Sequence, residues 1–198
     1  MIAEVQRLAG SGLVPQPVID AVNAVGWDGV VVPRMRVSDF MLYPVVRVLP
    51  EAWDEREQSG VAPQPHQFTL SLWESWQPDM GTPPPPSPVR IVGFVATGRL
   101  RATLRALVEM SGYAPGLALV TAARKPGVWA TAEADVCDMN LAWATRDGTV
   151  TLLWAGRQEP APTSAGRTTS VRHKEELVYA RMLASDLRAP AASRAAIA

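Results

Sequence analysis

The dipeptide Asp147-Gly148 limits the fold of this chain more than any other feature. Both residues tolerate the positive φ angles of a two-residue type I′ turn, and alternating apolar residues flank them on both sides. We therefore expect an antiparallel β-hairpin over residues 139–156. Such a hairpin commits this part of the chain to a sheet and fixes which side chains share a face.

Pairing across the turn divides the hairpin side chains between two faces. Trp143 should lie opposite Leu152, and Leu141 opposite Trp154, so that one face carries large apolar residues and belongs to the core. The other face is small and only mildly polar: Asn140, Ala142, Ala144, Thr151, Leu153 and Ala155. The C-terminal helix predicted at residues 170–187 has an apolar stripe that can cover this face. If that helix packs elsewhere, the small-residue face becomes a candidate interface.

The most regular segment, residues 89–123, predicts a βαβ unit. Residues 89–96 form an apolar strand, Thr97 can cap a helix that ends at Gly112, and residues 117–123 form a second buried strand. With the hairpin, this unit sets the expected fold class. That class is α+β, a single domain with a mixed sheet and the C-terminal helix packed on the sheet.

Prolines restrict the N-terminal part of the sheet. Residues 30–37 and 42–49 are rich in β-branched side chains, but they contain Pro33 and Pro44. Because proline cannot donate a ladder hydrogen bond, we expect edge strands, bulged strands or extended loops there.

Periodicity predicts the remaining elements. Alternation of apolar and polar residues indicates two further strands, at residues 67–76 and 127–136. Helical spacing, with proline near the start or glycine just after the end, indicates helices at residues 2–9, 17–25 and 50–59.

The expected domain organisation is simple. One α+β domain should cover residues 1–188, with a stiff proline-rich loop at 77–88. Residues 189–198 are rich in alanine and should form a flexible tail.

Composition disfavours several classes of function. Net charge is zero and 19% of residues are charged, whereas a general nucleic-acid binder needs a basic excess. Cys137 is the single cysteine, which excludes an internal disulfide and a cysteine zinc site, and with two histidines no metal or other cofactor is expected. We see no signal peptide and no apolar run that could span a bilayer, so the expected location is the cytoplasm and no membrane partner is predicted.

The first candidate site lies where the first strand of the βαβ unit meets its helix. The glycine spacing after Gly93 matches a phosphate loop, but Arg99 and Leu100 stand where the loop needs Lys and Ser or Thr. A helix N-terminus still offers free N–H groups and a positive potential. A weaker anion-binding site therefore stays open at Thr97, Gly98, Arg99 and Arg101. The alternative is that the arginines form a solvated helix face.

Three carboxylates form a second candidate: Glu133, Asp135 and Asp138. The first two would share one face of the predicted strand, where they could hold a metal or share a proton. The alternative is a solvated strand face, since neither a lysine in a suitable arrangement nor a histidine is close in sequence. Cys137 with either histidine lacks a local signature of nucleophilic catalysis.

The seven tryptophans are many for a chain of this length. Trp143 and Trp154 belong to the predicted core. An indole near loops and acids can anchor a partner, and a polyproline segment can bind an aromatic groove. The expected interface residues are Trp53, Trp76, Pro84 and Pro85.

No catalytic constellation is recognisable, so a function other than catalysis is favoured. The leading hypothesis is a non-catalytic binding or assembly protein that acts through protein–protein contacts, as a subunit of a larger complex or a homo-oligomer. The alternative is a small enzyme, or an accessory protein for nucleic acid or a phosphate ligand. It would use Arg99, Arg101 and Arg105 with Glu133 and Asp135.

Overall fold

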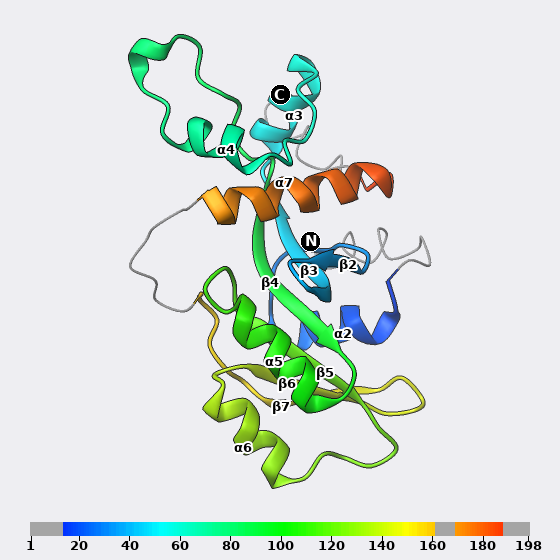
Figure 1. The fold of residues 1–198 in the computed structure, drawn as a ribbon. Helices are drawn as coiled ribbons and strands as arrows, with labels where there is room; N and C mark the ends of the chain where they lie inside the picture. Colours follow the sequence, from blue (N-terminus) through cyan, green and yellow to red (C-terminus); the bar gives the residue numbers. More distant parts are fainter. Residues whose placement is uncertain (1–13, 161–168, 188–198) are drawn as a thin grey trace. The chain divides into compact units, whose positions relative to one another are not determined.

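The computed structural model describes residues 14–160 and 169–187 (Figure 1). The chain forms two compact units, and each combines segments that are far apart in sequence. The first unit comprises Met1–Val46 and Ile91–Thr163, and the second comprises Arg47–Arg90 and Ser164–Ala198. The helix expected at residues 2–9 and the tail at 189–198 lie outside the described residues.

A mixed seven-stranded sheet organises the first unit, in the order β1-β3-β4-β5-β6-β7, with β2 also paired to β3. The pairs β4–β5 and β5–β6 are parallel, whereas β1, β2 and β7 pair with their neighbours antiparallel. The mixed sheet of the predicted α+β fold is therefore confirmed. The strands are β1 (Val30–Val31), β2 (Met35–Val37), β3 (Phe40–Val48), β4 (Val89–Thr97), β5 (Gly116–Thr121), β6 (Asn140–Ala144) and β7 (Val150–Trp154).

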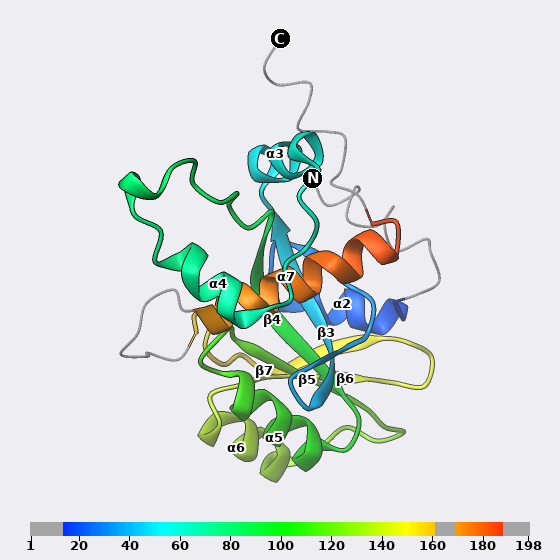
Figure 2. The same cartoon turned by 45° about the horizontal axis from the view of Figure 1, so that its top comes forward.

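Helices cover both faces of the parallel strands, as such strands require. The predicted βαβ unit is confirmed as β4, α5 (Leu100–Met110) and β5. A second crossover, α6 (Val128–Val136), joins β5 to β6 and packs on the same face as α5 (Figure 2). Helix α2 (Gln16–Val25) packs on the opposite face. It begins one residue before the predicted start and ends as predicted, with Gly26 in the left-handed conformation.

The strand predicted at residues 127–136 is wrong, because this segment is helix α6. It connects two parallel strands, and a crossover of this kind is usually a helix. The strand predicted at residues 67–76 is also wrong. That segment is helix α4 (Gln67–Glu74), which buries only Leu70 among its own residues.

The hairpin is confirmed, but its predicted register is wrong at the turn. The loop has three residues, since the Thr145 amide donates to the Thr149 carbonyl and only Gly148 in the loop has a positive φ. Trp143 therefore pairs with Thr151 rather than with Leu152. A bulge next to Leu141 restores the expected pairing of that residue with Trp154.

The turn is held by the side chain of Asp147. The hydroxyl of Thr145 donates to one carboxylate oxygen, and the hydroxyl of Thr149 donates to the other at 3.3 Å. The hydrogen bond from Thr145 is the main cause that lowers the pKa of Asp147. The side chain therefore favours this loop when it is ionised.

Pro33 and Pro44 lie where the sheet tolerates them. Pro33 falls between β1 and β2, so the partner of β3 is interrupted there. Pro44 lies inside β3 and accepts a hydrogen bond from the Val32 amide at 2.8 Å across this interruption. The expected edge position is confirmed for the segment around Pro33, which follows β1 at the edge of the sheet. It is wrong for Pro44, because β3 lies between β1 and β4.

Only the β6 part of the predicted small-residue face is covered by α2. The shifted register places Leu153 of β7 in the other apolar cluster and leaves Thr151 exposed, so the predicted division of the β7 side chains between the two faces is wrong. Ala142 and Ala144 are fully buried in the same apolar cluster as Val18 and Val22 of this helix. Helix α2 therefore supplies the cover that was expected from the C-terminal helix. It follows that Ala142 and Ala144 are not available to a partner.

Trp27 follows α2 and packs directly on β4 at Gly93. A Cβ atom at position 93 would lie 2.3 Å from the indole ring. The indole N–H donates to Gln158 at 2.9 Å, and Gln158 in turn donates to the buried Asn140 at 3.3 Å. Gly93 is therefore a packing residue within a strand, which accounts for it without a phosphate loop.

The second unit is mainly helical. It contains α3 (Pro50–Ser59), α4, the short 3₁₀ helix η2 (Pro78–Met80) and α7 (Thr169–Ala184). Helix α3 ends at Gly60, as predicted. Helix α7 confirms the predicted C-terminal helix, and its charged residues Lys174 and Glu176 are buried.

We predict that Gly93→Ala destabilises the first unit by about 1–3 kcal/mol, because the new methyl group overlaps the Trp27 indole. Urea denaturation of the full chain measures this change. In a Trp27→Leu background the same substitution should cost much less, since the overlapping ring is gone. Equal costs in both backgrounds would contradict the assigned contact.

Candidate functional site

The structure places the predicted anion-binding residues at the end of β4 and the start of α5. Thr97 is the last residue of β4, Gly98 has a φ of +138°, and Arg99 is the N-cap of α5. The side chain of Arg101 is 91% exposed, and it lies 3.6 Å from a carboxylate oxygen of Glu133. The structure thus brings together one arginine and one carboxylate of the alternative function.

The predicted carboxylate group lies at the end of a helix rather than on a strand. Glu133 contacts Arg101, and Asp138 lies 3.3 Å from Arg157, so two of the three carboxylates have basic partners. Among the described residues, no group of three histidine, cysteine or acidic side chains is arranged to hold a metal ion. Cys137 is half-buried against the cluster beneath α5 and α6.

The predicted interface residues have mixed positions. Trp53 is 1% exposed, and it donates to Glu57 at 3.0 Å, so the expectation of an exposed indole is wrong for this residue. Trp76 is half-buried, with its N–H directed at the Gly81 carbonyl at 3.4 Å. Pro84 and Pro85 are also half-buried.

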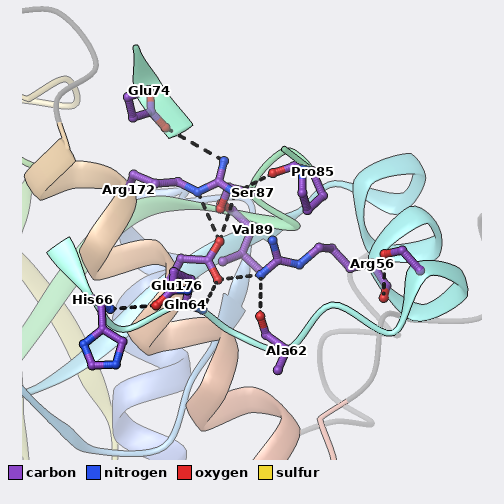
Figure 3. A network of polar contacts seen from close by, with 11 residues as sticks. Arg56, Ala62, Gln64, His66, Glu74, Pro85, Ser87, Val89, Arg172 and Glu176 are labelled. Atoms are coloured by element: carbon purple, nitrogen blue, oxygen red, sulfur yellow. Dashed lines mark hydrogen bonds and ion pairs between the residues drawn. The ribbon is translucent and has the colours of Figure 1, made fainter. Parts of the chain in front are cut away.

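A buried carboxylate lies between two arginines in the second unit (Figure 3). One oxygen of Glu176 accepts hydrogen bonds from Arg56 at 2.6 Å and from the Gln64 amide at 2.9 Å. The other accepts two from Arg172, at 3.0 and 3.1 Å. The side chains of Arg56 and Glu176 are fully buried, so the pairing replaces the solvation that both charges have lost.

Aromatic rings complete the surroundings of these arginines. The Arg56 guanidinium lies 5.7 Å from the Trp73 ring and 5.5 Å from the Tyr179 ring, and Arg172 lies 5.7 Å from Trp73. Within the described chain, Nε and Nη1 of Arg56 have no hydrogen-bond partner. The ring faces partly compensate for that loss through cation–π attraction. Burial raises the pKa of Tyr179, which keeps its phenol neutral.

This network connects segments that are distant in sequence. Arg56 comes from α3 and also donates to the Ala62 carbonyl at 3.3 Å. Arg172 donates to the Pro85 carbonyl at 2.7 Å, which attaches the proline-rich loop to α7. Arg172 also lies 3.9 Å from Glu74 of α4. The interior position of this network indicates a structural role, because it ties three helices and two loops together.

We predict that Glu176→Gln lowers the stability of the second unit by about 3–5 kcal/mol, because two buried guanidinium groups lose their shared counter-charge. Urea denaturation followed by tryptophan fluorescence measures the loss. Glu55→Gln, an exposed position on α3, is the matched control and should be near neutral. A triple replacement of Arg56, Arg172 and Glu176 by methionine should recover part of the loss. A neutral Glu176→Gln would contradict the account.

The most unusual surface of the first unit is the outer face of α6. Val128, Trp129 and Val136 are 83%, 85% and 87% exposed, and Ala132 lies between them at helical spacing. We call these four residues the α6 outer face. The single fully buried residue of this helix is Ala134, so its large apolar side chains are directed to solvent and a small one to the core.

Charged groups border the α6 outer face. Arg124 and Lys125, both exposed, precede the helix, whereas the exposed Asp135 lies in its second half beside Glu133, which pairs with Arg101. The surface is therefore an apolar stripe with a basic end and an acidic end.

Sequence reasoning missed this surface because it assigned residues 127–136 to a strand. Val128, Ala132 and Val136 recur at intervals of four residues, which was the available helical signal. With the four-residue spacing of a helix, Trp129 lies beside Val128 and Val136 on one side of the helix.

Comparisons with known proteins do not extend this description. No protein-family model matches the chain, and no curated protein or solved structure matches it. In the described part of the chain, no helix is both long enough and apolar enough to cross a membrane.

Proposed function

We propose that this chain is a non-catalytic binding or assembly protein that acts through protein–protein contacts. The observation that carries the proposal is the α6 outer face, where three large apolar side chains lie almost fully in solvent on one helix. A surface of this kind is typical of an interaction site, since contiguous exposed apolar groups are unfavourable in a free protein.

The energetics of this face suit a contact. Fully covering a valine side chain contributes roughly 1.5–3 kcal/mol, and an exposed tryptophan offers a larger area that often dominates an interface. None of these side chains belongs to the core of the first unit, so a partner can cover them without a change of fold. The helix also presents them on regular backbone, which limits the entropy lost on binding.

The alternative function has weaker support. A phosphate or nucleic-acid ligand at Arg99 and Arg101 would compete with Glu133, which already lies beside Arg101. That carboxylate reduces the positive potential at the start of α5. The anion site and the cytoplasmic location remain predictions.

A photo-cross-linking experiment tests the proposed function. A cross-linking amino acid replaces Ala132, at the centre of the α6 outer face, in cells that make the chain. We expect covalent adducts with protein that disappear when Trp129→Asp is added, because the acidic side chain prevents apolar contact. The same amino acid at Thr151, exposed on β7, is the matched control and should give no such adduct. Equal labelling at both positions, or none at residue 132, would refute the proposal.

A further inference from the structure

We propose that the partner of the α6 outer face is a second copy of this chain, and that the two α6 helices pack antiparallel about a two-fold axis at Ala132. This inference rests on the proposed function and makes it specific. The protein would then form a symmetric dimer through the first unit.

The spacing of the apolar residues is self-complementary under this symmetry. Val128 and Val136 lie four residues before and four residues after Ala132. A two-fold axis at Ala132 therefore places each Val128 opposite Val136 of the second copy, and Ala132 opposite itself. Alanine at the crossing point lets the helix axes approach to about 8 Å, the close end of helix packing. Trp129 then covers the side of the contact.

The charges select the same orientation. The basic end of the stripe, with Arg124 and Lys125, precedes α6. The exposed Asp135 forms the acidic end in the second half of the helix, since Glu133 already pairs with Arg101. Antiparallel packing brings each basic end to the acidic end of the other copy, whereas parallel packing would place like charges together. The net charge of zero leaves no general repulsion between copies.

The size of the contact sets its strength. Helix α6 has nine residues, so one face of it buries less than the ~800 Å² per partner of a standard interface. We therefore expect a reversible dimer with a dissociation constant in the micromolar range.

Sedimentation velocity of the full chain, from about 1 µM to about 1 mM, tests the dimer. The wild type should shift from monomer to dimer over this range, and Trp129→Asp should weaken the dimer at least about 30-fold, as expected for a central tryptophan. Phe68→Asp is a closely matched control, since Phe68 is 86% exposed and is also the second residue of its helix. It should leave the dimer unchanged.

Charge reversal tests the orientation. Lys125→Glu and Asp135→Lys should each weaken self-association about tenfold, because each variant places like charges at both ends of the contact. A mixture of the two variants should form a heterodimer about as strongly as the wild type forms its homodimer, since opposite charges then meet at both ends. A mixture as weak as the separate variants would overturn the antiparallel arrangement.

The outcomes separate this inference from the proposed function. A wild type that stays monomeric up to about 1 mM overturns the dimer. If residue 132 then cross-links to a different protein, the proposed function stands while the second copy is excluded as partner. If residue 132 gives no adduct dependent on Trp129, the proposed function fails as well.

Discussion

The first unit depends on one constraint: its parallel strands are buried on both faces and need a helix layer on each. Leu117, Ala118 and Leu119 of β5 alternate between the two apolar clusters, and all three are almost fully buried. Helix α2 covers one side, whereas α5 and α6 cover the other. Because α6 meets the core through small residues such as Ala134, its valines and tryptophan remain outside. The interaction surface is thus a consequence of how the sheet is covered.

The second unit is held together by buried ion pairs as well as by apolar packing. Its long helix α7 has charged residues on most sides, and Glu176 pairs with Arg56 and Arg172 in its interior. A buried ion triplet of this kind contributes little net stability compared with apolar packing, but it is costly to break. It therefore specifies which segments meet, since another arrangement would leave a buried charge without a partner.

The sequence predicts those features that depend on local chemistry. Helix α2, the βαβ unit and the hairpin follow from proline and glycine positions and from apolar runs. It does not predict features set by distant contacts. Arg56 and Glu176, which form a buried ion pair, are 120 positions apart. The hairpin loop has one residue more than predicted, so Trp143 pairs with Thr151 instead of Leu152. Residues 127–136 fit both the two-residue period of a strand and the period of a helix. The parallel pairing of β5 with β6, which the sequence does not reveal, is what favours the helix.

The central claim is that the α6 helices of two copies pack antiparallel, with Ala132 at the two-fold axis. Disulfide cross-linking tests this claim most directly. In a Cys137→Ser background, Ala132→Cys should oxidise readily to a covalent dimer, because the two Cα atoms face each other across the axis within disulfide reach. Val128→Cys should cross-link with Val136→Cys in a mixture, but not with itself. Self-cross-linking of Val128→Cys at the rate of the mixture, or no covalent dimer from Ala132→Cys, would contradict the account.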